Sequence, residues 1–330
     1  MIVKKEKHMF KHCNIPIFVS HSGCPHSCVF CNQKTITGTG DGADGEFVRK
    51  TVEDYLATMN KDFSVQLAFF GGSFTGIPMC RQEELLSVGY EYIKQGQIDS
   101  IRISTRPDYI DKEILDFLKN HGVKAIELGM QSSDDGVLEA NERGHSHAVT
   151  QQAAKLIKEK GFELGLQMMT GLYTSTPQKD LATAREIVRL GADTTRIYPT
   201  MVLGGTKLCS LYENGEYIPP TLEENISLCA DIFEIFKSAG VKVLRVGLQS
   251  TDTICENGRI VAGAYHSAFG ELVQSRIIRK KLEKLAIEAP GDTIEIEVKK
   301  SDVSKTVGNK RCNIDYINEK FGKNIIIKQI

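Results

Sequence analysis

Six short apolar runs alternate with longer segments of helical period, and this alternation limits the possible folds more than any other feature. The runs read IPIFVS, VQLAFFGG, IRISTR, AIELGMQ, ELGLQMM and TRIYPT. Between them, apolar residues recur at intervals of three and four, as in DKEILDFLKNHG and HAVTQQAAKLIKEKG. Several of these segments end in a glycine where a helix C-cap is expected, namely Gly122, Gly161, Gly191 and Gly240. The alternation predicts parallel strands joined by right-handed crossovers.

Polar or glycine-rich residues follow each of the six strands. Three cysteines come after the first, and GGSFTG, STRPD, GMQSSD, MMTGL and YPTMVLGGT come after the others. In parallel barrels the loops at the carboxyl ends of the strands build the active site. We therefore favour an α/β fold with a partial parallel (β/α)6 barrel over a doubly wound sheet. KVLRVGLQSTD is a possible further strand.

The pattern changes beyond residue 255. AFGELVQSRIIRKKLEKLAIEA predicts one basic helix, Pro290 and Gly291 mark a boundary, and the rest predicts strand, helix, tight turn, helix and strand. We expect a partial barrel over residues 1–255, a basic helical connector over 256–289 and a small α+β appendage over 290–330. Residues 276–330 hold 13 Lys and Arg against 8 Asp and Glu. This excess indicates either an anionic partner or a solvated basic surface.

Two further features bear on location. No apolar run is long enough to cross a bilayer, and MIVKKEKHMFKHC lacks the apolar region of an export signal. We expect a cytoplasmic protein with no membrane partner, in which structural disulfides are improbable. The nine cysteines then need another explanation.

Cys24, Cys28 and Cys31 lie close together directly after the first strand. Three thiolates at this spacing suit a zinc site completed by His21 or His26. They equally suit three irons of a [4Fe–4S] cluster whose fourth iron stays open. The other cysteines are isolated, as buried core cysteines usually are. A three-ligand site with an open corner is therefore the favoured interpretation.

The spacing CxxxCxφC, with Phe30 in the aromatic position, resembles the motif of the radical S-adenosylmethionine (SAM) superfamily. The resemblance implies a [4Fe–4S] cluster and SAM as cofactors, and cleavage of SAM to a 5′-deoxyadenosyl radical that abstracts a hydrogen atom. It also implies that residues after each strand contact the cofactor: Phe30, Gly71, Gly72, Ser73, Ser104, Arg106, Gln131, Arg143 and Met169. Ser73 stands where many members have an acidic residue.

A longer resemblance covers most of residues 100 to 250. STRPDYI, GMQSSDDGVLEANERGHSHAVTQQAAKLIKEKGF and RIYPTMVLGGTKLCSLYENGEYIPPTLEE look like the radical domain of the Elongator catalytic subunit. That family modifies the wobble uridine of tRNA, so the resemblance implies an RNA substrate and an electron donor such as flavodoxin or ferredoxin. The family also carries an acetyltransferase domain, and no segment of this sequence is long enough for one. An acyl-CoA step is therefore not predicted.

The basic end offers candidate RNA contacts. GNKR between two predicted helices, with Gly308 at the turn, resembles the GxxG loop of a KH domain, in which Arg311 replaces the second glycine. Lys280, Lys281, Lys310 and Arg311 are the candidate RNA-binding residues. The alternative is a small cap on the barrel. His266 is either a substrate contact or a packing residue.

The sequence thus predicts a radical SAM enzyme that acts on a base of RNA, with tRNA as the expected substrate. Two alternatives stay open at this point. One is radical chemistry on a small metabolite, as in relatives of oxygen-independent coproporphyrinogen oxidase. The other is a non-catalytic iron–sulfur protein that binds RNA or acts as a scaffold.

Overall fold

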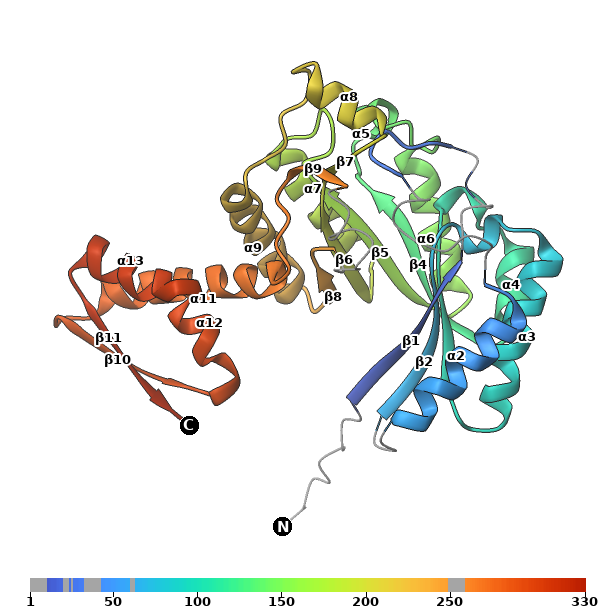
Figure 1. Cartoon of the computed structure of the whole chain (residues 1–330), viewed down its shortest axis with the longest axis horizontal. Coiled ribbons are helices and arrows are strands. Elements are labelled where there is room, and N and C mark those ends of the chain that lie inside the picture. Colours follow the sequence, from blue (N-terminus) through green and yellow to red (C-terminus); the bar gives the residue numbers. More distant parts are fainter. Residues whose placement is uncertain (1–10, 20–23, 25, 33–42, 60–62, 249–258) are drawn as a thin grey trace, which may run out of the picture. The chain divides into compact units, whose positions relative to one another are not determined.

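The structure is a computed structural model that describes residues 11–19, 24, 26–32, 43–59, 63–248 and 259–330 (Figure 1). Its strands are β1 (Lys11–Val19), β2 (Phe63–Gly71), β3 (Ser100–Thr105), β4 (Val123–Gln131), β5 (Glu163–Thr170), β6 (Thr194–Pro199), β7 (Met201–Leu203), β8 (Lys242–Val246), β9 (Ile260–Gly263), β10 (Thr293–Val298) and β11 (Asn324–Gln329). Its α-helices are α2 (Gly45–Thr58), α3 (Met79–Lys94), α4 (Lys112–Asn120), α5 (Asp135–Ala140), α6 (His147–Glu159), α7 (Pro177–Arg189), α8 (Lys207–Glu213), α9 (Leu222–Ser238), α11 (Phe269–Glu288), α12 (Val303–Val307) and α13 (Cys312–Phe321). Short 3₁₀ turns are η1 (Phe74–Gly76), η2 (Pro107–Tyr109), η3 (Lys300–Asp302) and η4 (Asn309–Arg311).

Seven strands form the main sheet, in the order β1–β2–β3–β4–β5–β6–β8. The pairs β1–β2, β2–β3 and β3–β4 are parallel. The predicted α/β class and the partial parallel barrel are therefore confirmed, and the sheet has one strand more than the six predicted. The seventh is β8, from the KVLRV segment, which pairs next to β6. It is five residues long and only partly buried, so its apolar signal is weak.

The chain divides into two compact units. The first comprises residues 1–131, 138–167 and 190–194, and the second comprises residues 132–137, 168–189 and 195–330. The sequence predicted three parts, with boundaries after residues 255 and 289. Both boundaries fall within the second unit, and residue 255 lies outside the described residues. That division stays a prediction.

The first unit contains β1 to β4 with their covering helices (Figure 1). Helix α2 contacts β1, α3 contacts β3, and α4 and α6 contact β4. Strands β3 and β4 are buried along almost their whole length, as expected for parallel strands that are covered on both faces. Their core includes Leu67, Ile103 and Ile126, none of which is exposed to solvent.

Local signals explain where the helices begin and end. The Asp111 carboxylate accepts a hydrogen bond of 2.8 Å from the Ile114 N–H and caps α4. The four predicted C-cap glycines all have positive φ: Gly122, Gly161, Gly191 and Gly240 at 79°, 80°, 70° and 76°. Because this conformation strains other residues, the glycines end these helices as predicted.

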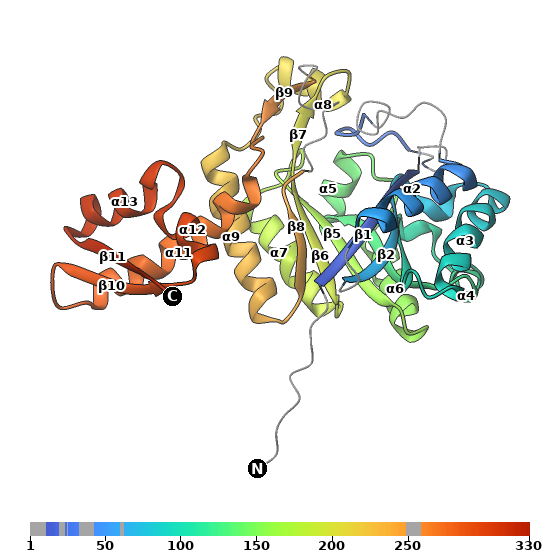
Figure 2. The ribbon, with the colours of Figure 1, turned by 60° about the horizontal axis from the view of Figure 1, so that its bottom comes forward.

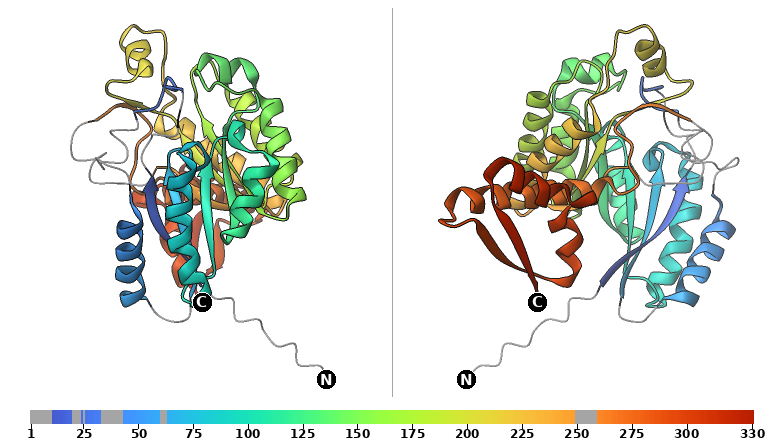
Figure 3. Two further views of the ribbon diagram at one scale, coloured as in Figure 1. Left: turned by 90° about the vertical axis from the view of Figure 1, so that its right-hand side faces the viewer. Right: turned by 60° about the vertical axis from the view of Figure 1, so that its left-hand side comes forward.

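The second unit carries the C-terminal elements, which Figures 2 and 3 show from further sides. Helix α11 contacts α9, α12 and α13, and β10 pairs with β11 in parallel. Leu282 and Ala286 of α11 pack with Ile294 and Ile317 in a small core. The predicted order of strand, helix, turn, helix and strand is therefore confirmed by β10, α12, η4, α13 and β11.

Candidate cluster and cofactor site

The three motif cysteines follow β1 on one loop of the first unit. Cys28 is buried, and Cys24 and Cys31 are partly exposed. The Cys31 N–H donates to the Cys28 carbonyl at 2.9 Å, which makes a tight turn between these two residues. No disulfide joins any of the eight cysteines in the described part of the chain. His21, one of the two candidate fourth ligands for zinc, lies outside the described residues.

This cysteine loop, of which the structure describes residues 24 and 26–32, docks on the segment between α5 and α6. The Val29 N–H donates to the Asn141 carbonyl at 3.2 Å. Gly144, with φ of 71°, lies against the His26 ring so closely that a Cβ would come within 2.3 Å of its Nε2. A glycine at position 144 is therefore required for the observed approach.

Arg143 joins this segment to a cysteine sulfur. Its guanidinium is buried, and Nη1 donates to Cys28 Sγ at 3.3 Å. Nη2 donates to the Gly129 carbonyl at 2.6 Å and lies 3.3 Å from His145 Nε2. A positive charge and an N–H donor therefore lie beside the sulfur of Cys28.

His145 is neutral beside Arg143 at pH 7. Burial and then the charge of Arg143 lower its pKa to about 4. If Nδ1–H donates to the Ser146 carbonyl at 3.3 Å, Nε2 is left as an acceptor for Arg143. His145 then holds the guanidinium that contacts Cys28.

The glycines after β2 and the hydroxyl beside them have different surroundings. Gly71 has φ of 106°, and Gly72 is partly exposed. Ser73 is buried: its Oγ lies 2.8 Å from Thr105 Oγ1 and accepts from the Arg106 N–H at 3.3 Å. The Ser73 hydroxyl thus ties the end of β2 to the end of β3, and its predicted cofactor contact stays a prediction.

Arg106 and Ser104, the candidates after β3, are both engaged within the first unit. Arg106 Nε and Nη2 donate to the Asp108 carboxylate at 2.9 and 3.0 Å, and Nη2 also donates to the Arg143 carbonyl at 2.6 Å. Ser104 Oγ accepts from Gln167 Nε2 at 3.1 Å. A cofactor carboxylate would therefore meet Arg106 through Nη1 or in place of Asp108.

Gln131 ends β4 in a left-handed conformation, with φ of 65°. Its side-chain Oε1 is buried and has no hydrogen-bond partner among the described residues. A buried acceptor without a donor is costly, which suits a ligand hydroxyl or N–H at this point. Phe30 on the cysteine loop and Met169 near the end of β5 are both partly exposed.

The candidate RNA-binding residues fall into two groups in the second unit. Lys280 on α11 pairs with Asp231 and Glu234 of α9. Lys281, Lys310 and Arg311 are exposed. The basic character of α11 is thus partly neutralised by α9.

The His266 side chain contacts the residue before α11, Ala268, which is the N-cap of that helix. Its Nδ1 accepts from the Ala268 N–H at 3.0 Å, at the start of α11. Both roles considered for His266, substrate contact and packing, stay predictions.

Whether these residues fit a cluster depends on the donor set. In the part of the chain that the structure describes, no three Cys, His, Asp or Glu side chains lie close enough together to hold a metal ion. The three thiols nevertheless share one short loop, and the sulfur of Cys28 faces a guanidinium donor. Soft cysteine sulfurs are the usual ligands of iron–sulfur clusters. The donor set therefore fits the cluster predicted from the sequence.

A parallel half barrel with a three-cysteine loop after its first strand defines an enzyme class that keeps an iron–sulfur site at the strand ends. The chain belongs to the radical SAM superfamily: the model of that superfamily matches residues 18–187, and the model of the Radical_SAM C-terminal domain matches residues 192–279. It is a radical SAM enzyme, and the cofactors of this family are a [4Fe–4S] cluster and SAM. The family, enzyme class and cofactors predicted from the sequence are confirmed.

Three similar proteins extend this assignment. An uncharacterized protein of Methanocaldococcus jannaschii, MJ0486, is 30% identical over 245 residues, which cover 70% of this chain and 74% of that protein. A tRNA uridine(34) acetyltransferase of Methanocaldococcus infernus is 25% identical over 308 residues, 81% of this chain and 57% of that protein. The solved structure of archaeal Elp3 from Methanocaldococcus infernus, with residues 1–46 deleted, has a TM-score of 0.66 and 22% identity, and covers 82% of this chain and 63% of that one.

The Elongator-like resemblance predicted from the sequence is thus confirmed. The chain spans little more than half the length of the curated acetyltransferase that it matches. Among the described residues, no helix is both long and apolar enough to cross a membrane.

The sequence did not identify two groups of the site. Gly144 and His145 lie in the segment NERGHSH beside Arg143, the one residue of that segment predicted to contact the cofactor. Gln167 and Glu127 join the neighbouring strands β5 and β4, because Gln167 Nε2 donates to Glu127 Oε2 at 2.9 Å. The alternation of polar residues along β4 and β5 was the available signal for this second group.

Proposed function

We propose that this protein is a radical SAM enzyme that modifies a base of RNA, with tRNA as the substrate. The observation that carries the proposal is the similarity over 81% of the chain to a protein named tRNA uridine(34) acetyltransferase. This similarity connects the half barrel and its cysteine loop with an RNA substrate. The proposal concerns the radical step and the substrate class, and includes no acyl transfer.

Each site residue has a role in this proposal. Cys24, Cys28 and Cys31 hold three irons, and Arg143 donates a hydrogen bond to the sulfur of Cys28. When bound, the cluster and SAM supply the 5′-deoxyadenosyl radical that abstracts a hydrogen atom. Gln131 presents its buried Oε1 to the cofactor. The other proposed cofactor contacts are those predicted from the sequence.

The C-terminal elements supply RNA contacts in this proposal. The segment β10–α12–η4–α13–β11 presents the exposed Lys310 and Arg311 at the turn between its two helices. Two cations at a tight turn suit the phosphates of an RNA backbone. We retain residues 290–330 as a KH-like appendage, residues 256–289 as its connector and residues 1–255 as the barrel. An electron donor such as flavodoxin or ferredoxin belongs to the same proposal.

The test is an anaerobic assay of SAM cleavage. The protein is reconstituted with iron and sulfide and incubated with SAM, dithionite and bulk tRNA, and 5′-deoxyadenosine is measured by mass spectrometry. Production that rises with tRNA supports the proposal. Production indifferent to tRNA contradicts the RNA substrate and favours a small metabolite. No cleavage despite an intact cluster favours a scaffold.

Cysteine variants check the cluster assignment in the same assay. Replacing Cys24, Cys28 and Cys31 with Ala is expected to abolish the brown chromophore. Cys209→Ala and Cys229→Ala are the controls, because both thiols are buried in the second unit and lie outside the cysteine loop. Loss of the chromophore in these controls would show that the cluster ligands are wrongly assigned.

A further inference from the structure

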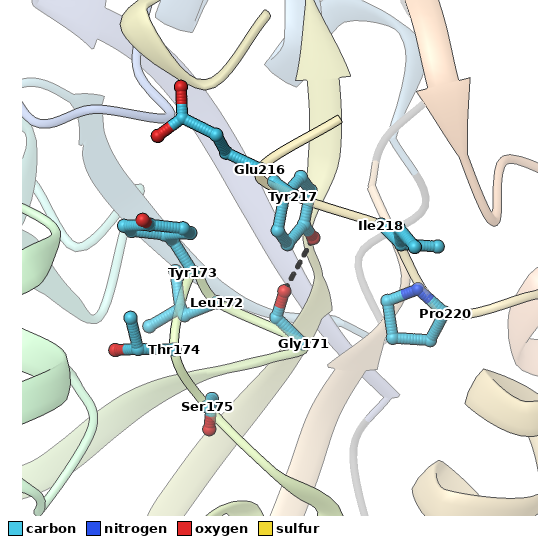
Figure 4. Close-up of a pocket in the computed structure, with 9 residues that line it drawn as sticks. All are labelled: Gly171, Leu172, Tyr173, Thr174, Ser175, Glu216, Tyr217, Ile218 and Pro220. Atoms are coloured by element: carbon cyan, nitrogen blue, oxygen red, sulfur yellow. Dashed lines mark hydrogen bonds between the residues drawn. The ribbon is translucent and has the colours of Figure 1, made fainter. Parts of the chain in front are cut away.

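A pocket of about 320 Å³ opens in the second unit beside the loop that follows β5 (Figure 4). Its walls are the segment 171–175 and residues Glu216, Tyr217, Ile218 and Pro220 of the connection between α8 and α9. This volume is at the lower end of the range for small-molecule sites, so it suits a single ring system. None of the residues proposed to contact the cluster or SAM lines it.

Hydrogen bonds hold both walls of the pocket in place. The Tyr217 hydroxyl donates to the Gly171 carbonyl at 2.6 Å, a bond that Figure 4 marks. The buried Asp180 carboxylate accepts from the Gly171 N–H at 2.9 Å and from the Ser175 hydroxyl at 2.6 Å. On the other wall, Asn225 Nδ2 donates to the Pro220 carbonyl at 3.2 Å. The pocket is therefore preformed, which reduces the entropy cost of binding.

Two aromatic side chains, Tyr173 and Tyr217, line the pocket. The rings of Tyr173 and Tyr217 lie 6.2 Å apart between centroids and nearly perpendicular, at 76°. Tyr217 is buried and fixed by its hydroxyl, whereas Tyr173 is partly exposed and offers ring surface to a ligand. Ile218, which is 83% exposed, adds an apolar contact at the rim. A partly exposed aromatic ring such as that of Tyr173 binds planar rings by stacking.

The charge of the lining limits the ligand further. The residues that line the pocket include one carboxylate, Glu216, and no Lys or Arg. A phosphate would meet no cation there, so the phosphate end of a nucleotide is excluded from the pocket. A carboxylate accepts hydrogen bonds from the amino or imino N–H groups of a nucleobase.

We propose that this pocket binds one unpaired nucleobase of the RNA substrate, stacked on Tyr173. The inference rests on the proposed function and adds the site at which the RNA is read. Enzymes that act on RNA bases commonly turn a base out of its stack and hold it by stacking and by hydrogen bonds to its edge. The phosphates of that nucleotide stay outside, where cations of other segments neutralise them.

The test measures binding of an unmodified anticodon stem–loop RNA that carries 2-aminopurine in its loop, followed by fluorescence with the reconstituted full-length protein. Tyr173→Ala is expected to raise Kd about 5- to 150-fold, the effect of removing one base–aromatic stack. Tyr173→Trp is expected to bind within about twofold of the wild type, because a larger ring still stacks. An RNA duplex of the same composition is expected to compete poorly.

Two further variants separate stacking from damage to the fold. Tyr212→Ala is the matched control, since Tyr212 is 37% exposed on α8 and does not line the pocket; its Kd is expected to stay unchanged. Ile218→Ser alters a side chain that is exposed and is expected to raise Kd about fourfold, the worth of one buried methylene. Circular dichroism confirms that each variant is folded.

The outcomes distinguish this inference from the proposed function. Equal affinities of the wild type and Tyr173→Ala, with tRNA-dependent formation of 5′-deoxyadenosine intact, overturn the pocket and leave the function standing. Equal competition by the duplex also overturns it, because binding then involves only the backbone. A wild type that neither binds the RNA nor responds to tRNA overturns both.

Discussion

Gly144 sets how closely the cysteine loop approaches the segment after α5. Its φ of 71° is strained for any other residue, and a Cβ would come within 2.3 Å of His26 Nε2. His26 stands two residues before Cys28, whose sulfur accepts the hydrogen bond from Arg143. One missing methyl group therefore permits the contact between the buried cation and the cysteine loop.

Gly144→Ala is expected to weaken the docked loop. The left-handed conformation alone costs a non-glycine residue about 1–2 kcal/mol, which is about 5- to 30-fold in the ratio of docked to undocked loop. The clash with His26 adds to this cost. We expect a lower iron and sulfide content per chain after anaerobic reconstitution, with a weaker visible absorbance.

Gly161→Ala is the matched control, because Gly161 has the same kind of φ, 80°, but a Cβ at this position would have no atom within 4 Å. It carries the backbone strain without the clash and is expected to retain its full iron content. Equal iron in the two variants would show that the contact between Gly144 and His26 does not support the cluster.

The cysteine motif can be recognised in the sequence because its spacing is local, whereas the surroundings of the cysteines could not be predicted. Arg143 lies 115 residues from Cys28, and only the folded sheet brings the guanidinium to the sulfur. Arg106 illustrates the opposite case. Its position after β3 was predicted, but Asp108, two residues further on, takes two of its N–H groups. A sequence pattern predicts where an arginine lies in the fold more readily than it predicts the hydrogen-bond acceptor of that arginine.

At the scale of elements, helix ends were predictable and strand partners were less so. Caps such as Asp111 and Gly122 act through neighbouring residues, so the sequence carries the whole signal. Strand β8 depends instead on a neighbour, β6, that is more than 40 residues away, and its own five residues carry little signal. The loop that follows β5 also depends on a distant residue, because the Tyr217 hydroxyl, 46 residues away, donates a hydrogen bond to Gly171.

The loop after β5 is expected to give the protein a pH-dependent stability through Asp180. Burial raises the pKa of this carboxyl from 3.8 to about 6, and the hydrogen bonds from Ser175 and Gly171 oppose the rise. A raised pKa means that the folded state holds the proton more tightly than the unfolded state. The protonated Asp180 therefore contributes its full stabilisation of the folded state below about pH 4. This contribution is lost as the pH rises through about 6.

Asp180→Asn is expected to remove this dependence. Because each pKa unit is worth about 1.4 kcal/mol, the free energy of unfolding of the wild type should fall by about 3 kcal/mol relative to the variant between pH 4 and pH 7. Urea unfolding at several pH values measures it. Ser175→Ala removes a donor that lowers the pKa, so it should move the loss to higher pH. Parallel pH profiles for wild type and Asp180→Asn would contradict this account.

At the scale of the whole molecule, the charge is unevenly distributed along the chain. The net formal charge is −1, although residues 276–330 carry an excess of Lys and Arg. Part of this excess is neutralised within the second unit, where Arg276 pairs with Glu223 and Lys280 with Asp231. Lys310 and Arg311 are exposed at the turn between α12 and α13, where Arg311 Nε lies 3.8 Å from Asp315, and both have positive φ, 51° and 65°. The total charge of a segment does not reveal which cations face solvent. For this reason the sequence analysis named both Lys280 and Lys310 as candidate RNA-binding residues.

The double variant Lys310→Glu with Arg311→Glu is expected to weaken tRNA binding while SAM cleavage in the absence of tRNA continues. If each cation releases one counterion from a phosphate, the slope of log K against log salt should fall by about 1.4 to 1.8 in magnitude. Filter binding at several salt concentrations measures this slope.

Lys155→Glu is the control, because the Lys155 side chain is 77% exposed on α6 in the first unit. A double variant that keeps the wild-type slope would exclude the turn between α12 and α13 as a phosphate contact, and the RNA would then have to be held by other cations, such as Lys281.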